Sequence, residues 1–419
     1  MKKIGLIGLG CVGLGFYQLL KEKKYSKAII TKVVVKNRKK KRDIEKEILF
    51  FDVDAVINDS SIDIIVEVID DAKAAFEIVK KALAAGKPIV TANKKMIAEN
   101  LPELIALQQK YATPVLYEAA VCGAIPIIRK IEQQFSHERI DRIRGIFNGT
   151  SNYILTKLNT GNQDYSQALD DAQRKGFAES DPTNDVGGHD AVFKSVILAR
   201  HAFGVSFDPR SVFVVGIDAL ARDDFGYAKS IGQKLKLIPT IFSFGNKVGI
   251  VVLPQFVKSD DQLFLVENEF NAVIVEGQYA GKQSYYGLGA GAFPTAFSLF
   301  SDLRDVLGGL CYDYTRLGRS YQALNDDEIL LEVYVRFKNK NVKELVGIKN
   351  VREGFIHDDF HYVIGETTLA KLKRASRHVL EDGGVIISTG SIRYKGHHLN
   401  EDVVLANKHA AALNAISII

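Results

Sequence analysis

A stretch in the middle of the chain, residues 176–195, gathers acidic and basic side chains that could do chemistry together. Asp190 and Lys194 stand four residues apart at the start of a helical pattern, so they lie on one helix face, about 6 Å apart along its axis. Glu179 lies on the loop that leads into this helix and could fold back over that face. Two carboxylates and an ammonium that face one space can bind the charged groups of an amino acid and move a proton. Asp190 and Lys194 are therefore candidate catalytic residues.

An ordinary explanation competes with this one. An Asp and a Lys at this spacing most often form an exposed bridge on a helix surface, worth a few tenths of a kcal/mol. The choice between the two depends on what the rest of the chain is built to hold.

A glycine-rich turn near the N-terminus indicates a nucleotide-binding element. Residues 4–7 have a buried-strand pattern, and after the turn a helical pattern runs to about residue 24. Glycines in this strand–turn–helix context permit a tight turn and let the backbone approach a pyrophosphate at the helix N-terminus. The turn reads GLGCVG, and its candidate cofactor contacts are Gly8, Gly10, Cys11, Val12 and Gly13.

The end of the second strand indicates which dinucleotide is preferred. An acidic residue at this point serves the ribose hydroxyls of NAD, whereas Arg and Lys suit a 2′-phosphate. No acidic residue occurs between Lys23 and Arg42, and the strand at 28–35 runs into KNRKKKR. We therefore expect NADP(H) to be preferred over NAD(H), with Arg38 and Lys39 as candidate phosphate contacts. A nucleic-acid patch or a solvated loop is the alternative, but no aromatic residue interleaves the run.

Strand and helix patterns alternate through residues 62–90, which predicts a doubly wound parallel sheet. Ligands of such sheets bind at the carboxyl ends of the strands. The segment that follows the strand at 88–90 reads TANKK. Thr91, Asn93 and Lys94 are therefore candidate cofactor contacts, and Lys94 is also a candidate catalytic residue at the nicotinamide end.

At 419 residues the chain is long for one hydrophobic core, and two or three domains are expected. The sequence predicts an α/β protein whose N-terminal part is a Rossmann domain. A glycine-rich segment ahead of a later helical pattern indicates a return of the chain to the cofactor, with Gly291 as a candidate contact. The expected domains are a Rossmann domain at 1–135 with 287–325 returning to it, an α+β substrate-binding and dimerisation domain at 136–286, and a small ferredoxin-like domain at 326–419.

The composition of the chain narrows the class of protein and its cellular compartment. Hydrophobic residues make up 47% of the chain and charged residues 25%, which is typical of globular proteins, and no apolar run reaches the ~18 residues of a membrane helix. The three cysteines are far apart, which fits a reducing compartment without a disulfide framework. The net charge of +5 is mild. We expect a cytoplasmic protein with no nucleic-acid or membrane partner.

Taken together, the motifs resemble the homoserine dehydrogenase family over about residues 4–310. The resemblance is carried, in the family's order, by GLGCVG, TANK, EAAVCGAIPII, GIFNGTSNYIL, GFAESDPTNDVGGHDAVFK and GLGAGAFPTA. It implies NADPH-dependent, reversible reduction of L-aspartate 4-semialdehyde to L-homoserine in threonine and methionine biosynthesis. It also implies a homodimer formed through the middle domain.

The resemblance assigns roles to particular residues. Glu179 takes a substrate-binding role, Asp190 and Lys194 belong to the reacting end, and Lys94 belongs to the cofactor–substrate junction. The substrate-proximal turn comprises Gly149 and Thr150, and Phe177 stands where relatives commonly have Tyr. Some relatives hold a structural Na⁺ or K⁺ by backbone carbonyls, and the matching positions here are Glu118, Val121, Gly123 and Ile125.

The C-terminal part departs from the family pattern. Many relatives carry an amino-acid-binding ACT domain with an Asp-x-Pro-Gly turn after its first strand, but residues 338–341 read KNKN here. The tail is therefore interpreted as a diverged, ACT-like module, which puts threonine inhibition in doubt.

Two lysines compete for the role of proton donor to the substrate oxygen. We favour Lys94 beside the reacting oxygen, with Asp190 and Lys194 positioning or relaying the proton. Two other functional classes stay open: another NADP-dependent amino-acid dehydrogenase, and a non-catalytic NADP(H)-sensing protein. The second is disfavoured because sensing does not require the intact set of Glu179, Asp190 and Lys194.

Overall fold

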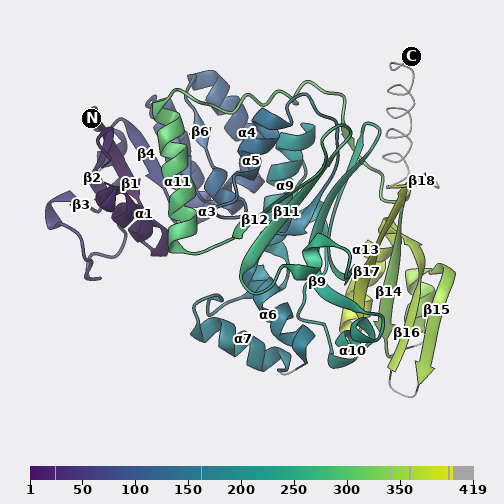
Figure 1. The fold of residues 1–419 in the computed structure, drawn as a ribbon. Coiled ribbons are helices and arrows are strands. Elements are labelled where there is room, and N and C mark those ends of the chain that lie inside the picture. The colour runs from purple at the N-terminus through teal and green to yellow at the C-terminus, as the bar shows by residue number, and fades with distance from the viewer. Residues whose placement is uncertain (24, 162, 340, 358–359, 395–396, 400–419) are drawn as a thin grey trace, which may run out of the picture. The chain divides into compact units, whose positions relative to one another are not determined.

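The computed structural model describes residues 1–23, 25–161, 163–339, 341–357, 360–394 and 397–399 (Figure 1). The chain divides into two compact units. Unit 1 contains Met1–Ser136, Val196–Ala202 and Gly287–Arg316, and unit 2 contains His137–Ser195, Phe203–Tyr286 and the chain from Leu317 onward.

Unit 1 is built on a six-stranded sheet with the order β3-β2-β1-β4-β5-β6. Every neighbouring pair is parallel, and the strand order reverses beside β1, so the predicted Rossmann-like doubly wound sheet is confirmed. Its strands are β1 (Lys2–Ile7), β2 (Ala28–Val34), β3 (Leu49–Phe50), β4 (Ile64–Glu67), β5 (Ile89–Thr91) and β6 (Val115–Leu116).

Helices connect these parallel strands, as crossover connections require. They are α1 (Cys11–Glu22), α2 (Val53–Ile57), α3 (Ala72–Ala84) and α4 (Lys94–Tyr111). After the last strand of this sheet comes α5 (Ile127–Arg129), continued by a π-helical turn at Lys130–Gln134. A later helix, α11 (Ala292–Leu307), packs on α1. The approach is close because Gly15 has no side chain: a Cβ atom there would lie 3.0 Å from the carbonyl oxygen of Ala292.

Unit 2 is organised around a mixed sheet of twelve strands. The main path runs β12-β11-β7-β9-β10-β17-β14-β16-β15, while β8 and β13 pair with β10 and β18 pairs with β17 (Figure 1). The strands are β7 (Ile140–Ile146), β8 (Phe213–Val214), β9 (Gln233–Phe244), β10 (Lys247–Lys258), β11 (Phe270–Gly277), β12 (Gly281–Leu288), β13 (Gln322–Ala323), β14 (Ile329–Phe337), β15 (Lys349–His357), β16 (Phe360–Thr368), β17 (Val385–Tyr394) and β18 (His397–His398).

The helices that follow β7 carry the charged stretch singled out in the sequence. They are α6 (Gly149–Thr160), α7 (Tyr165–Arg174), α8 (Thr183–Val186), α9 (His189–Phe203) and α10 (Arg222–Ser230). Helix α9 contributes its first residues to unit 2 and Val196–Ala202 to unit 1.

The last part of the chain follows the order β14-α12-β15-β16-α13-β17, with α12 at Asn341–Val346 and α13 at Leu369–Glu381. Its strands pair in the order β17-β14-β16-β15, which is a ferredoxin-like βαββαβ arrangement. The arrangement joins the rest of the sheet where β17 pairs with β10, at Ser388 and Gln255. Its hydrophobic core is continuous with that of β8–β10, because Val251 and Leu253 belong to the same cluster as Val333 and Ile386.

Candidate functional site

The candidate catalytic pair of α9 lies inside unit 2. Nζ of Lys194 is 2.7 Å from Oδ2 of Asp190, as the i,i+4 spacing predicts. Asp190 is 1% exposed and Lys194 is 5% exposed, so the pair is a buried ion pair and not the exposed bridge considered above. Buried charges are expensive unless they are paired and hydrogen-bonded. The surroundings of the pair therefore decide what it can do.

Residues at the end of β7 hold both members of this pair. Lys194 donates from Nζ to the backbone carbonyl of Phe147 at 2.6 Å, and Asn148 donates from Nδ2 to Oδ2 of Asp190 at 2.9 Å. The same Asn148 amide donates to Oδ1 of Asp185 at 2.7 Å. An ammonium has three N–H groups, and these contacts use two of those of Lys194. The third is available to a substrate oxygen.

Asn148 has a role that the sequence did not predict. It also caps the next helix, because its Oδ1 accepts from the backbone N–H of Ser151 at 2.7 Å. The link to Asp190 spans 42 residues of sequence. Such a contact leaves no local pattern, and the only signal was the polar turn directly after a buried strand.

The candidate substrate-binding residues lie around the first turn of α6. Gly149 is the first residue of this helix, and a Cβ atom there would lie 2.6 Å from the carbonyl oxygen of Glu269. Thr150 donates from Oγ1 to the carbonyl of Phe177 at 2.5 Å, which ties the segment after α7 to this turn. The Phe177 ring packs on Tyr153, with ring centroids 4.8 Å apart.

Glu179 follows that anchored segment and is exposed. Its backbone carbonyl accepts from Nε2 of Gln173 at 2.9 Å. Among the described residues, its carboxylate makes no hydrogen bond or ion pair, so it does not contact the pair on α9 in this structure. The carboxylate is available to a ligand.

The glycine-rich turn of unit 1 has the geometry of a phosphate-binding turn. Gly8 has a φ of 103°, and a Cβ atom at Gly13 would lie 2.3 Å from the carbonyl oxygen of Gly8, so both positions require glycine. A Cβ atom at Gly10 would meet no protein atom within 4 Å. Packing therefore does not require glycine at this position, and the bare backbone leaves room for a ligand at the N-terminus of α1. Cys11 and Val12 form the first turn of that helix.

Gly291 stands at the corresponding end of α11. It has a φ of 114° and precedes the first residue of the helix. Because α11 packs on α1 near Gly15, the N-terminus of α11 belongs to the same part of unit 1 as the glycine-rich turn.

The basic loop follows β2 and is exposed from Lys36 to Lys41. The Arg38 guanidinium lies over the ring of Phe51, 4.8 Å from its centroid, which holds one cation in a defined place. The Lys39 backbone N–H donates to Oδ1 of Asn37 at 2.9 Å, and Arg42 donates to the Asn37 carbonyl at 2.8 Å. The loop leaves β2 at the carboxyl edge of the sheet, the same edge as the glycine-rich turn after β1. Arg38 and Lys39 fit a 2′-phosphate at that edge.

The TANK segment is held by a buried carboxylate that was not predicted from the sequence. Thr91 donates from Oγ1 to Oε2 of Glu67 at 2.7 Å, and the Asn93 backbone N–H donates to Oγ1 of Thr91 at 3.0 Å. Asn93 in turn caps α4, whose first residue is the half-buried Lys94. Burial raises the pKa of Glu67 to about 7. The ends of β4 and β5 are thus fixed by one chain of hydrogen bonds.

The four carbonyls that correspond to a cation site lie in one tight loop. The loop turns through Cys122 and Gly123, both with a φ of 56°. Each of three carbonyls accepts one hydrogen bond, from Val121 N–H to Glu118, from Ser298 to Gly123 and from Ile127 N–H to Ile125. A carbonyl has two lone pairs, so each of these three oxygens keeps the capacity for a second partner. The described residues contain no cluster of three or more His, Cys, Asp or Glu side chains that could hold a metal ion.

The Glu118 carboxylate is held by protein groups. It accepts from the backbone N–H groups of Ile128 and Arg129 at 2.8 and 2.9 Å. Burial and the nearby charge of Asp302 raise its pKa to about 8. Arg129 pairs with Asp302 at 2.6 Å, so the two carboxyl groups share one guanidinium.

Comparisons with known proteins show which family the chain is similar to. A family model described as the homoserine dehydrogenase NAD-binding domain matches residues 8–118, and one described as homoserine dehydrogenase matches residues 126–303. The chain is 39% identical to the homoserine dehydrogenase of Bacillus subtilis over 314 residues, which are 73% of this chain and 72% of that protein. It is 34% identical to that of Lactococcus lactis over 347 residues, 79% and 81% of the two chains.

Solved structures give the same result. A homoserine dehydrogenase from Thiobacillus denitrificans superposes with a TM-score of 0.82 at 28% identity, covering 93% of this chain and 98% of that one. The Staphylococcus aureus enzyme superposes with a TM-score of 0.70 at 28% identity, covering 94% and 99%. Among the described residues, no helix has the length and apolar character needed to cross a membrane.

Proposed function

The chain belongs to the homoserine dehydrogenase family, NAD(P)-dependent oxidoreductases that act on a CH–OH group, and from this we propose that it reduces L-aspartate 4-semialdehyde reversibly to L-homoserine with NADPH. The observation that carries the proposal is the buried Asp190–Lys194 ion pair at 2.7 Å, with one N–H of Lys194 left unused. We propose that this reaction is a step of threonine and methionine biosynthesis.

Unit 1 supplies the proposed cofactor contacts. The backbone at Gly10 and the N-terminus of α1 would hold the pyrophosphate, and Arg38 and Lys39 would hold the 2′-phosphate. Thr91, Asn93 and Gly291 would contact the cofactor farther along. When bound, NADPH supplies the hydride that adds to the aldehyde carbon.

Unit 2 supplies the proposed substrate contacts. The substrate is an amino acid, so its ammonium group needs a carboxylate, and the uncommitted carboxylate of Glu179 fits this need with a charge-assisted hydrogen bond. Gly149 and Thr150 form the turn beside the substrate. Phe177 would contribute a ring beside the substrate, without the hydroxyl that the Tyr of relatives would offer at this position.

The reduction requires a proton at the oxygen that was the carbonyl. A lysine ammonium that donates to this oxygen polarises the carbonyl and then transfers the proton. We propose Lys94 as the donor, with Asp190 and Lys194 positioning the substrate and relaying the proton. Asn148 fixes Asp190, and through Asp190 it fixes the direction of the Lys194 ammonium.

Three finer features are also proposed. The carbonyls of Glu118, Val121, Gly123 and Ile125 would bind Na⁺ or K⁺. The chain would form a homodimer through the middle part of unit 2. The ferredoxin-like arrangement would be a diverged ACT-like module. In the segment at 338–341, which differs from the Asp-x-Pro-Gly turn of ACT domains, Lys340 lies outside the described residues.

A direct assay tests the proposal. Purified protein is mixed with L-aspartate 4-semialdehyde, and absorbance loss is followed with NADPH and with NADH in parallel. Fast loss with NADPH and slow loss with NADH is expected. Equal rates would support the proposed reaction but contradict the proposed 2′-phosphate contacts. No absorbance loss with either cofactor would overturn the proposed function.

A further inference from the structure

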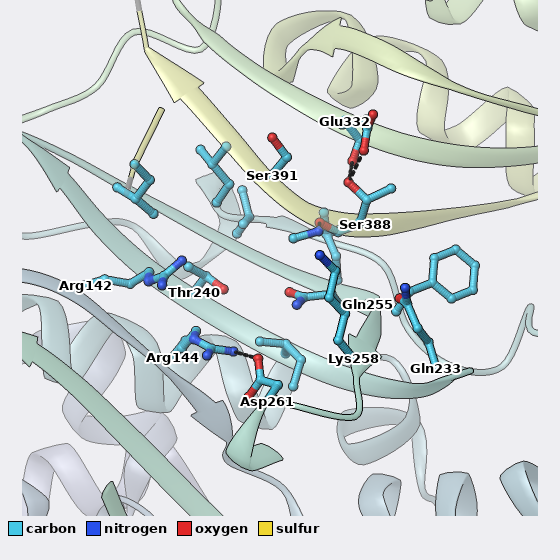
Figure 2. Close-up of a pocket in the computed structure, with 18 of the residues that line it drawn as sticks. Arg142, Arg144, Gln233, Thr240, Gln255, Lys258, Asp261, Glu332, Ser388 and Ser391 are labelled. Carbon is cyan, nitrogen blue, oxygen red and sulfur yellow. Dashed lines mark hydrogen bonds and ion pairs between the residues drawn. The ribbon is translucent and has the colours of Figure 1, made fainter. Parts of the chain in front are cut away.

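A cavity of about 380 Å³ lies within unit 2, away from the Asp190–Lys194 pair, where the long sheet meets the ferredoxin-like arrangement. Its size is at the lower end of the ~300–1,000 Å³ usual for small-molecule sites. The only residues paired in register between β10 and β17 among the described strands, Gln255 and Ser388, both line it. Figure 2 shows Arg142, Arg144 and Thr240 on one side of the cavity and Ser388 and Ser391 on the strand opposite.

Two guanidinium groups are built into the wall. Arg142 pairs with Glu276 through Nε and Nη2, at 3.0 and 2.8 Å, and is 7% exposed. Arg144 is equally buried and donates from Nη1 to Asp261 at 2.7 Å. Replacing such buried pairs by apolar residues is often neutral or stabilising, so they are not explained by stability. Each carboxylate holds its guanidinium in place and leaves other N–H groups of that guanidinium unused.

Neutral polar groups beside them also lack protein partners. Thr240 is 4% exposed, yet its hydroxyl makes no hydrogen bond among the described residues. Since Thr240 lines the cavity, its hydroxyl is open to a ligand there. The Gln255 amide likewise makes no protein hydrogen bond in the described part of the chain, and it lies against Gly390, which has a φ of 89°.

The balance of charge selects the class of ligand. Five Lys and Arg side chains line the cavity against three Asp and Glu side chains, and Glu276 behind the wall adds a fourth carboxylate. Arg352 is paired with Glu332 at 3.2 Å. Lys258, at the end of β10, makes no ion pair among the described residues. The surplus charge in the lining is therefore positive.

We propose that this cavity binds a small organic or inorganic anion, a carboxylate or a phosphate, through Lys258 and the unused N–H groups of Arg142. Thr240 and Gln255 provide the neutral hydrogen bonds. Because the walls come from β7, β9 and β10 on one side and from β17 on the other, a bound anion fastens the ferredoxin-like arrangement to the sheet. The inference goes beyond the proposed function, since it concerns neither the cofactor nor the reacting groups.

Calorimetric titration of the full chain tests it in a buffer of low anion content. L-Malate serves as the carboxylate probe and inorganic phosphate as the phosphate probe, and whichever binds identifies the source. Lys258→Ala and Thr240→Val should each weaken binding by about tenfold or more, because each removes one direct contact. Thr240→Val keeps the side-chain shape, so loss of the fold does not confuse the result. Lys247→Ala, a lysine of the same strand outside the cavity, should leave binding unchanged.

Hydrogen exchange locates the binding. The probe that binds should slow exchange of the backbone amides in β17 and in the second half of β10. If neither probe binds at millimolar concentration, or if both variants bind as well as the unaltered chain, the proposal is overturned. The proposal would also be overturned if exchange of these amides slowed with rising protein concentration and not with added probe. In that case another copy of the chain would cover this face. None of these readouts depends on turnover.

Discussion

Nζ of Lys194 lies 2.7 Å from Oδ2 of Asp190, and the two side chains are only 7% and 1% exposed. The same i,i+4 spacing occurs at the C-terminal end of α7, where Lys175 and Asp171 are 3.0 Å apart with side chains 50% and 15% exposed. The two pairs are alike in sequence and differ in burial. They therefore provide a matched comparison of a buried and an exposed ion pair in one protein.

Lys194→Ala is expected to lower turnover by about 10²–10⁴-fold. It also leaves the Asp190 carboxylate buried without its cation, which should destabilise the fold by about 3 kcal/mol or more. Lys194→Arg separates the two effects: it keeps a positive charge beside Asp190 but cannot give up a proton near neutral pH. Turnover and urea unfolding are measured for both variants, with Lys175→Ala as the control that should keep full turnover. Normal turnover in Lys194→Arg would show that Lys194 only holds charge.

Lys94→Ala should lower turnover by about 10²–10⁴-fold while the free energy of unfolding changes little, since Lys94 is half-buried at the start of α4. The neighbouring Lys95 is exposed, and Lys95→Ala is the control. Steady-state assays at saturating NADPH give the comparison. If Lys94→Ala were fully active, the proton donor would have to be sought at Lys194.

Glu179→Gln is expected to raise the KM for the semialdehyde by about tenfold or more, because it removes the charge from a hydrogen bond to the substrate ammonium. The maximal rate should change little, since Glu179 does not touch the reacting oxygen in this proposal. Asp170→Asn, an exposed carboxylate on α7, is the control. A KM equal to that of the unaltered chain would remove Glu179 from substrate binding.

Arg38→Ala should raise the KM for NADPH about tenfold and leave the KM for NADH unchanged, because only NADPH carries the 2′-phosphate. The effect should shrink at high salt, since Arg38 is exposed and salt screens exposed charges. Lys46→Ala, an exposed lysine beyond the basic loop, controls for net charge. Parallel rises for both cofactors would mean that Arg38 supports the loop and not the phosphate.

Glu67→Gln should alter how stability depends on pH. Burial raises the pKa of Glu67 from 4.5 to about 7, so between these values the folded protein holds a proton that the unfolded chain has lost. The contribution of Glu67 to stability therefore falls as pH rises through this window, by about 3 kcal/mol in all. The pKa values of Glu118 and Asp302 are also raised, so their contributions to stability fall with rising pH as well. Both residues are present in the variant and in the unaltered chain, so their contributions cancel when the two stabilities are subtracted.

Urea unfolding at pH 4.5 and pH 8 tests this. The gain of Glu67→Gln over the unaltered chain should be larger at pH 8 than at pH 4.5. A difference that does not vary with pH would mean that Glu67 titrates normally. A lower NADPH affinity in the same variant would show that the chain of hydrogen bonds through Thr91 positions the cofactor edge.

Local patterns made part of this protein predictable. The glycine-rich turn, the basic loop and the Asp190–Lys194 spacing are features of contiguous sequence, and the parallel sheet follows from alternating strand and helix patterns. The contacts of Glu67 with Thr91 and of Asn148 with Asp190 span 24 and 42 residues. No periodicity records such contacts, so neither role was predicted.

Other misses have equally physical causes. Helix α4 was not predicted, and it contains Pro102, although proline usually breaks a helix. The pairing of Gln255 with Ser388 was not predictable either, because strands far apart in sequence carry no mark of their partner. As a result, a tail that sequence patterns set apart turned out to share a sheet and a core with the middle of the chain.

The pairing of β10 with β17 also determines where the chain can be truncated. A chain ended before β14 would uncover that part of the β10 edge and the apolar face around Val251 and Leu253. Unpaired edges of this kind recruit other strands and lead to aggregation. The C-terminal arrangement is thus a protective cover for the sheet as well as an extension of it, and a shortened chain would be a poor mimic of the intact enzyme.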